Sequence, residues 1–179
     1  MRARREFERL ALPHLAAVYR LARQFAGADR ADDLVQETYL RAWSRFHQFD
    51  PASNCRAWLC RILHNVWVSN WRKTRLELPV AEIEDVHAEP QYDWESDIVR
   101  EEISHDMQWA LDQLPDAFRW AVLLADVEDL TYQEISKTMN CPVGTVMSRL
   151  NRGRQMLARL LEGRRAANAV TPVRPIRVK

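Results

Sequence analysis

The hydrophobic positions along this chain recur mostly with the 3.6-residue period of an α-helix, and no stretch alternates with the two-residue period of a half-buried strand. In the first half, one apolar stripe ends near Gly27, which can cap a helix, and Pro13 is expected to start or kink that helix. A second helix is predicted from about Asp29, and a third from about Cys55 to Thr74. The pattern therefore predicts an all-α fold.

The second half continues the helical pattern after a stretch that lacks it. Residues 76–95 contain two prolines and many carboxylates without a sustained period, so we interpret them as a linker. A helix is predicted from about Ser96, and Pro115 suits the first turn of the next helix, which is expected to end near Asp126. The tail from Arg164 is predicted to be disordered.

The stretch from 130 to 161 predicts two helices joined by a tight turn. Thr131, followed three residues later by Glu134, forms a capping-box start. Asn140 tolerates the left-handed conformation that ends a helix, and Pro142 prevents its continuation. The second helix keeps its apolar residues on one face, while most of its basic and short polar residues fall elsewhere. This arrangement is typical of a DNA-reading helix-turn-helix, although a helical hairpin with solvated arginines has the same pattern.

Charge is segregated along the chain, although the formal net charge is only +1. Residues 1–75 carry 14 Lys or Arg against 7 Asp or Glu, whereas residues 76–129 carry 2 against 16. Residues 130–165 return to 7 against 2. Two basic blocks that flank an acidic one indicate two modules facing nucleic acid, with a different surface between them.

The helix predicted from 55 to 74 interleaves aromatic and basic residues. Such a surface suits single-stranded nucleic acid, because bases stack on rings while cations follow the phosphates. Trp58 lies on the apolar stripe of this helix and is interpreted as a core residue. For Trp67 and Trp71 the pattern does not decide between the core and a base-stacking surface.

Two clusters share a helix face in a way that a metal ion could use. Asp33 and Glu37 have the spacing of a metal-dependent nuclease pair, but no third acidic or His cluster accompanies them. Cys60 and His64 are also four residues apart, yet a structural zinc needs four ligands in short-spaced pairs. We therefore prefer a solvated or partner-docking helix start and free thiols, and we expect no metal or cofactor.

Three cysteines without a regular spacing favour a reducing compartment. The N-terminal residues lack the apolar segment of a signal peptide, and the longest strongly apolar run, 120–125, is too short to span a bilayer. The protein is therefore expected to be soluble and cytoplasmic, without insertion into a membrane.

Three segments together resemble the hallmark segments of an extracytoplasmic-function (ECF) sigma factor of RNA polymerase. They are ADDLVQETYLRAW at 31–43, SNCRAWLCRILHNVWVSNWRK at 53–73 and CPVGTVMSRLNRGR at 141–154. Their order and spacing are similar to those of the family, and the resemblance covers nearly the whole chain apart from the linker and tail.

The resemblance implies a bacterial alternative sigma factor with two small helical domains. The implied boundaries are a sigma-2 domain at 1–75, an acidic linker at 76–95, a sigma-4 domain with the helix-turn-helix at 96–165, and a disordered basic tail at 166–179. In this arrangement the sigma-2 domain binds core polymerase and recognises and melts the -10 element, while the sigma-4 domain recognises the -35 element.

The resemblance also assigns functional residues. The face that docks on the clamp helices of the polymerase β′ subunit consists of Asp32, Asp33, Gln36 and Glu37. Contact with the -10 element falls to Phe49, Ser53, Asn54, Arg61, Ile62 and Asn65. The -35 element is read or gripped by Thr145, Ser148, Arg149 and Arg152.

Two of the positions in these segments carry open questions. Ile62 also lies on the apolar stripe of its helix, so a core role competes with the DNA contact. Met147 stands where family members often have Lys, so a phosphate contact is missing there or an apolar contact to a thymine methyl replaces it.

The implied mechanism is binding, with the chemistry supplied by the polymerase, so the chain is not expected to be an enzyme. Its implied partners are core RNA polymerase through the β′ clamp helices and the β subunit, promoter DNA in duplex and single-stranded form, and an anti-sigma factor. The principal alternative is a dimeric helix-turn-helix regulator that binds duplex operator DNA without polymerase. That alternative leaves the acidic face and the aromatic-basic helix of the first half without a purpose.

Overall fold

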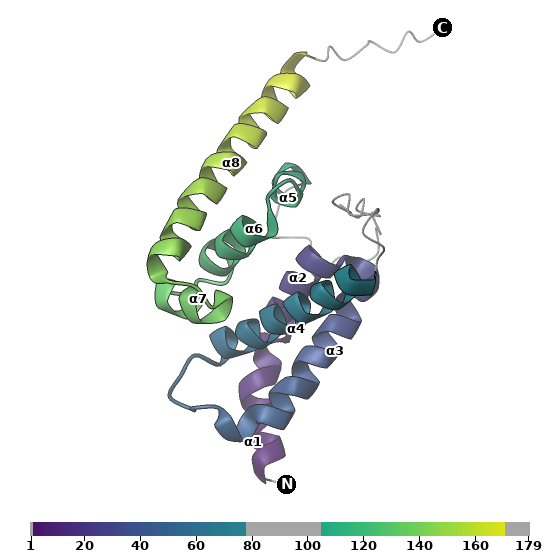
Figure 1. Cartoon of the computed structure of the whole chain (residues 1–179), viewed down its shortest axis with the longest axis vertical. Helices are drawn as coiled ribbons and strands as arrows, with labels where there is room; N and C mark the ends of the chain where they lie inside the picture. The colour runs from purple at the N-terminus through teal and green to yellow at the C-terminus, as the bar shows by residue number, and fades with distance from the viewer. Residues whose placement is uncertain (1, 78–104, 171–179) are drawn as a thin grey trace, which may run out of the picture.

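Every regular element among the described residues, 2–77 and 105–170, is a helix, as Figure 1 shows. This computed structural model confirms the predicted all-α fold. The N-terminal module, residues 2–77, contains α1 (Arg2–Ala11), α2 (Leu15–Ala26), α3 (Ala28–Arg45) and α4 (Cys55–Glu77). The C-terminal module, residues 105–170, contains α5 (His105–Asp112), α6 (Asp116–Val122), α7 (Tyr132–Met139) and α8 (Val143–Val170).

The boundary between α1 and α2 follows from Pro13. α1 ends at Ala11, a 3-10 turn covers Leu12–His14, and α2 begins directly after it. Because proline lacks a backbone N–H and crowds the preceding turn, the prediction that Pro13 starts or kinks a helix is confirmed. α2 ends at Gly27, whose φ of 74° lies in a region that glycine adopts without steric cost.

The core of the N-terminal module lies between α2, α3 and α4. Each helix contributes small and branched side chains at helical spacing, and the most deeply buried include Val18, Leu21, Leu59, Leu63 and Val66. Thr38 is the buried polar residue of α3, and its hydroxyl donates to the Leu34 carbonyl at 2.7 Å, so its burial leaves no donor unsatisfied.

The C-terminal module is built around the contact of α6 and α7 with α8. Gly153 is the point of closest approach, because a Cβ placed there would lie 2.8 Å from Cγ2 of Val122 on α6. The capping box of α7 is present as predicted: the Thr131 hydroxyl accepts from the Glu134 N–H, and the Glu134 carboxylate accepts from the Thr131 N–H. Asn140 then ends α7 in the left-handed conformation, with φ of 48°.

Two predicted boundaries need correction. α4 continues to Glu77 rather than ending near Thr74, and α8 continues to Val170. The prediction of a disordered tail at 166–179 is therefore wrong for residues 166–170, because the sequence after Leu161 is rich in the good helix formers Ala and Arg, and the single glycine, Gly163, does not end the helix. The rest of that tail, most of the predicted linker, and residues 96–104 of the predicted fifth helix lie outside the described residues.

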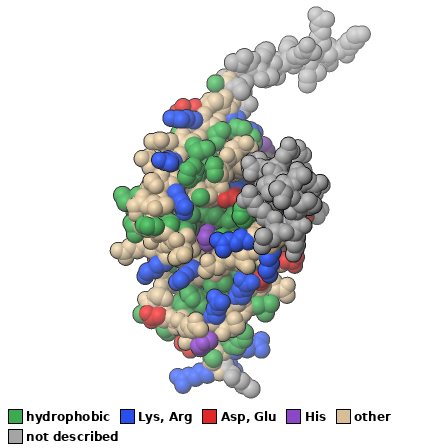
Figure 2. Space-filling model, viewed as in Figure 1, with side chains coloured by type: hydrophobic (Ala, Val, Ile, Leu, Met, Phe, Trp, Pro, Cys, Tyr) green, Lys and Arg blue, Asp and Glu red, His purple; other side chains and the backbone are tan. Residues whose placement is uncertain are grey.

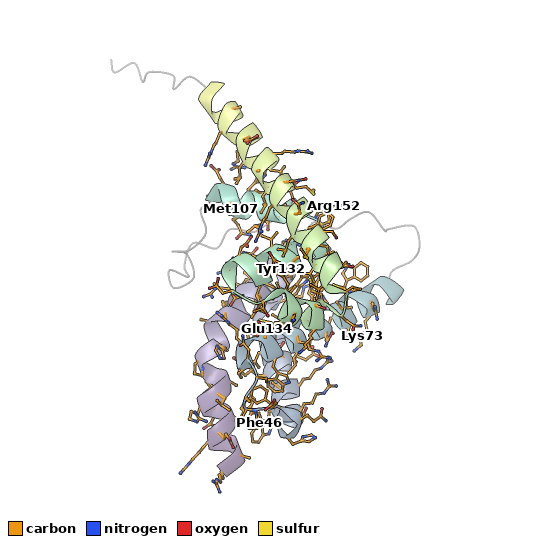
Figure 3. All side chains as sticks on the ribbon, turned by 90° about the vertical axis from the view of Figure 1, so that its left-hand side faces the viewer. Phe46, Lys73, Met107, Tyr132, Glu134 and Arg152 are labelled. Carbon is orange, nitrogen blue, oxygen red and sulfur yellow. The ribbon has the colours of Figure 1, made fainter. Side chains whose placement is uncertain are left out.

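The two modules contact each other through α4 and α7 and through side chains of α2 and α6 (Figures 1 and 3). The ring of Phe25 on α2 stacks on that of Trp120 on α6, with a centroid distance of 3.9 Å and an interplanar angle of 4°. The Arg119 guanidinium lies over the Phe25 ring, 4.7 Å from its centroid. No described helix is long and apolar enough to cross a membrane.

Candidate nucleic-acid and polymerase interface

The N-terminal half of α8 presents a polar face to solvent. Val146 and Leu150 are buried at one-turn spacing, which directs the residues between them outward. Ser148 and Arg152 are exposed, while Thr145 is partly buried and its carbonyl accepts from the Ser148 hydroxyl at 2.9 Å. The four residues assigned to the -35 element thus lie within the first three turns of the second helix of the helix-turn-helix.

Arg149 has surroundings different from those of its neighbours. Its side chain is partly buried, and Nη1 lies 3.5 Å from the Sγ of Cys141 in the turn before α8. Its positive charge also contributes to lowering the pKa of His64 on α4. Arg149 therefore points toward the side of α8 that faces the N-terminal module.

Met147 lies on the side of α8 opposite to Arg149. Its side chain is 53% exposed and lines a shallow hollow between α7 and α8. Tyr132, Ser148, Asn151 and Arg154 line the same hollow, with Leu150 at its base. An apolar side chain is therefore placed next to hydroxyl and amide groups on the surface of α8. The sequence around Met147 does not predict this combination, because Tyr132 comes from another helix.

The loop from 46 to 54 joins α3 to α4 and is tied to the core by stacked rings. Phe49 is buried, and its ring lies 5.9 Å from that of Phe46 and 4.8 Å from that of Trp58. The exposed Ser53 donates its hydroxyl to the Asp50 carbonyl at 2.6 Å. Asn54 is exposed as well, and its side-chain oxygen accepts from the Ala57 N–H, so it is the N-cap of α4.

The assigned -10 residues on α4 fall on two sides of the helix. Arg61 and Asn65 are exposed, four residues apart on one face. Ile62 is only 6% exposed and belongs to the core. The structure therefore brings Ser53, Asn54, Arg61 and Asn65 to the surface, and keeps Phe49 and Ile62 beneath it.

The three tryptophans of α4 have different surroundings. Trp58 packs partly buried against the core, as predicted. Trp67 contacts both Phe25 and Trp120 at ring-centroid distances of 5.3 and 5.9 Å, and its Nε1 donates to the Phe25 carbonyl at 3.3 Å. Trp71 is 47% exposed, in the C-terminal part of α4.

A groove runs between α4 and α7. Its wall on α4 carries polar and basic side chains, and α7 closes it with Met139 and Asn140. The α4 residues are His64, Asn65, Val68, Ser69, Arg72 and Lys73. Burial, together with the Arg149 charge, lowers the pKa of His64 to about 4 despite a hydrogen bond with Asn65, so the imidazole at this site is neutral near pH 7.

The acidic face assigned to polymerase docking lies on α3. Asp32, Asp33 and Gln36 are exposed, as a protein-docking surface requires. Glu37 is held from two sides, since Arg41 donates to one carboxylate oxygen at 2.6 Å and Asn70 of α4 donates to the other at 3.0 Å. Glu37 therefore anchors the face to α4, and the other three side chains are its accessible part.

The two clusters considered as metal sites do not gather further ligands. Among residues 2–77 and 105–170, no group of three or more His, Cys, Asp and Glu side chains is arranged to hold a metal ion. The three cysteines are free thiols, two buried and Cys141 partly buried, as predicted. Burial raises the pKa of Cys60 to about 12, so this thiol is protonated and inert.

One buried charge was not predicted. Glu128, in the segment that precedes α7, is completely buried, and its carboxylate lies 3.3 Å from Arg20 on α2 and 3.9 Å from Arg56 on α4. Nothing in the sequence distinguishes it from the other carboxylates of the acidic block, because both of its partners lie in the other module.

Comparison with known proteins identifies the two modules. The Sigma-70 region 2 family matches residues 10–77, and the Sigma-70 region 4 family matches residues 105–166. Over 134 residues the chain is 40% identical to the ECF RNA polymerase sigma factor EcfG of Rhodopseudomonas palustris, covering 75% of this chain and 72% of the relative. It is 30% identical to the ECF sigma factor SigW of Bacillus subtilis, covering 80% of this chain and 82% of the relative.

A solved structure agrees with these matches. The co-crystal structure of the sigma factor RpoE with the anti-sigma factor NepR from Bartonella quintana superimposes with a TM-score of 0.69 and 32% identity. The superposition covers 88% of this chain and 97% of that one. These findings confirm the resemblance and do not favour the operator-binding regulator. The chain belongs to the family of ECF RNA polymerase sigma factors, alternative sigma factors that bind core RNA polymerase and direct promoter recognition and transcription initiation.

Proposed function

We propose that the three exposed faces described above divide the work of initiation. The face of α8 with Thr145, Ser148, Arg149 and Arg152 reads or grips the -35 element in the major groove. The observation that carries this assignment is the helix-turn-helix geometry: the capped α7, the left-handed Asn140 and Pro142 place the first turns of α8 at the surface with polar side chains outward.

The surface residues of the 46–54 loop and α4 contact the -10 element. Ser53 and Asn54 offer hydrogen-bonding groups at the start of α4, and Arg61 and Asn65 continue the same kind of surface along the helix. Phe49 and Ile62 are buried, so their contribution is to hold the loop and helix in position, and a direct contact with a base requires the loop to move.

The accessible acidic face of α3 docks on the β′ clamp helices of core polymerase. Exposed carboxylates suit a basic protein partner rather than a polyanion. A metal-nuclease role for Asp33 has no support in its surroundings, since the described part of the chain gathers no further ligands around it.

Both promoter elements cannot be contacted while the modules are in contact with each other. By their names, the two elements lie about 25 base pairs apart, or about 85 Å of B-form duplex at about 3.4 Å per base pair. In the structure, α4 packs directly on α7. We infer that the modules separate when the protein engages polymerase and promoter DNA.

An anti-sigma factor is a further expected partner. The structural relative from Bartonella quintana was crystallised with the anti-sigma factor NepR. The structure has a closed arrangement, in which the two modules contact each other. The groove between α4 and α7 has walls from both modules, so this surface exists only in the closed arrangement. A protein that binds across both modules would therefore keep them from separating.

A reconstitution experiment tests the proposal. The full chain is added to core RNA polymerase and promoter DNA, and co-elution and run-off transcripts are measured. The double variant Asp32→Asn with Asp33→Asn is expected to weaken binding to core enzyme about five- to thirtyfold and so to lower co-elution, since two charged contacts each contribute about 0.5 to 1 kcal/mol at an interface.

Asp129→Asn is the matched control, because it removes an exposed carboxylate from the C-terminal module and should leave co-elution unchanged. Wild-type protein that fails to co-elute with core enzyme would contradict the polymerase docking itself. A double variant that binds core enzyme as well as wild type would instead assign docking to another surface.

A further inference from the structure

α1 has two faces of opposite character. Phe7 and Ala11 are buried against the rest of the N-terminal module. Arg2, Arg5 and Arg9 have the i, i+3, i+7 spacing of a single helix face, and all three are exposed. At 100° per residue, this basic face points away from the buried one, so α1 carries a row of three guanidinium groups at the surface.

The exposed Glu6, four residues after Arg2 and three before Arg9, is the acidic neighbour of these three arginines, and it leaves their face with an excess of positive charge. The fourth arginine of α1, Arg4, is paired with Glu8 at 2.8 Å on a different face of the helix. Among residues 2–77 and 105–170, no ion pair involves Arg2, Arg5 or Arg9. Their positive charge is therefore available to an anionic ligand.

Stacked rings fix α1 next to the 46–54 loop. The ring of Phe7 lies 5.2 Å from that of Phe46 and 5.3 Å from that of Trp43, in both cases edge to face. Phe46 in turn stacks on Phe49 inside the loop. The Tyr39 hydroxyl donates to the Ala11 carbonyl at 3.0 Å and holds the end of the helix against α3.

The views agree with these contacts. Figure 1 places α1 and the loop between α3 and α4 at the same end of the molecule, and Figure 3 shows Phe46 beside α1. Figure 2 shows Lys and Arg side chains at this end. The match to Sigma-70 region 2 begins at residue 10, so nearly all of α1 lies outside the matched segment and the resemblance gives it no role.

We propose that the exposed face of α1 formed by Arg2, Arg5 and Arg9 binds backbone phosphates of promoter DNA next to the segment held by the 46–54 loop. Guanidinium groups pair with phosphate oxygens through two parallel hydrogen bonds, and a row of them follows a strand without reading its sequence. The site extends the -10 surface beyond the residues assigned to it, and it rests on the proposed role of the loop and α4 in -10 binding.

The test uses holoenzyme and a promoter fragment whose -10 strand is single-stranded. The triple variant Arg2→Gln, Arg5→Gln, Arg9→Gln removes the charges while keeping good helix formers. Each phosphate contact to a single strand contributes about 0.7 to the slope of log affinity against log salt, so the variant should flatten that slope by about 2. Arg4→Gln is the control: it removes a charge already paired with Glu8 and should leave the slope unchanged.

Each outcome has one meaning. A slope unchanged in the triple variant, with far-UV circular dichroism showing α1 intact, overturns the proposal. A loss of core-polymerase binding with an unchanged slope also overturns it, because α1 would then contact the enzyme. If Arg61→Gln on α4 also leaves DNA binding unchanged, the proposed -10 surface itself is wrong. If the triple variant leaves DNA binding unchanged but Arg61→Gln weakens it, only the role of α1 is wrong.

Discussion

Arg149 and Arg152 lie about one turn apart on α8 and are expected to act differently. Arg152 is exposed and is free to follow a phosphate. Arg149 is partly buried, and its donor group is directed at a sulfur, which is a weak acceptor. Moving that guanidinium to the edge of a base therefore costs little, so a side chain that points toward the N-terminal module in this structure can still serve as a reader once the modules separate.

The first prediction contrasts these two arginines. Arg149→Ala is expected to weaken binding to the cognate -35 element by about 1 to 3 kcal/mol and to remove the preference at one base pair, because a bidentate base contact is lost. Arg152→Ala should weaken binding to all sequences alike and flatten the salt dependence by about 0.9, the contribution of one phosphate contact in duplex DNA.

Holoenzyme binding to promoter duplexes with single substitutions in the -35 element, measured at several salt concentrations, separates the two effects. If the Arg149→Ala variant keeps the base preference of wild type, Arg149 does not read a base. A salt slope equal to that of wild type would remove Arg152 from the phosphate contacts.

Single residues were predictable where one local rule decides. Thr131 with Glu134 gives the start of α7, and Asn140 its end, because caps depend on neighbours three or four residues away. Ser53 and Asn54 are both residue types that favour a helix N-cap, and only the geometry shows that Asn54 caps α4 by accepting from the Ala57 N–H. The orientation of Arg149 could not be predicted either, since it depends on Cys141 across a turn.

At the scale of elements, the tightest constraint in the C-terminal module is the crossing of α6 and α8 at Gly153. A Cβ at this position would meet Val122 and would also lie 3.4 Å from the Cβ and carbonyl oxygen of Phe118. Nothing lies within 4 Å of the corresponding position at Gly163, later in the same helix. The two glycines therefore offer a matched pair, one packed and one open.

Alanine at the two glycines is expected to give opposite results. Gly163→Ala should stabilise the protein by about 0.5 to 1 kcal/mol, because glycine in a helix is unfavourable relative to alanine. At Gly153 the same gain is opposed by overpacking of about 1 to 3 kcal/mol, so Gly153→Ala should be the less stable variant by about that amount. Urea unfolding of both full-length variants, compared with wild type, measures the difference; equal stabilities would show that α6 yields without cost.

Helix boundaries followed from periodicity and proline where a breaker is present, as at Pro13 and Pro142. They were wrong where no proline ends the helix, and α4 and α8 both extend further than predicted. The π-helical turn at Leu123–Val127, which follows α6 and leads to Glu128, had no signal in the pattern, because one extra residue in a turn does not disturb an apolar run.

At the scale of the whole molecule, the contact between modules was the part that the sequence could not predict. The pattern left Trp67 undecided between the core and a base-stacking surface, and nothing in the sequence shows that it meets Trp120. Gln24 on α2 and Gln108 on α5 likewise exchange hydrogen bonds of 2.6 and 3.0 Å across the boundary. The two modules and their order were predictable. Their closed arrangement was not, because it depends on pairs far apart in the sequence, such as Gln24 and Gln108, which are 84 residues apart.

The closed arrangement also covers part of the -10 surface. Burial by itself would raise the pKa of the Glu134 carboxyl, but hydrogen bonds from Thr131 and from Asn54, with the charge on Arg56, lower it. Asn54, at the exposed start of α4, is therefore bound to α7 of the other module. We expect separation of the modules to free this side chain for its proposed contact with the -10 element.

The buried Glu128 gives a way to open the molecule. Arg20→Gln with Arg56→Gln leaves its carboxylate without either positive partner, and breaking a buried ion pair in this way costs about 3 to 5 kcal/mol. Both partners lie in the N-terminal module, so the charge regains water when the modules separate. The double variant is therefore expected to populate the open form, and small-angle X-ray scattering of the free protein should show a larger radius of gyration.

His64 supplies an independent readout of the same change, because its pKa of about 4 in the closed form depends mainly on burial. Opening exposes the imidazole and should return its pKa toward about 6.5. The open form then binds the proton more tightly, so lowering the pH from about 6.5 to 4 should favour opening in the wild-type chain too. Adding Glu128→Gln to the double variant removes the charge that has lost both arginines and should restore closure. A double variant that keeps the wild-type radius and His64 titration would show that the remaining contacts between the modules are sufficient to hold them together.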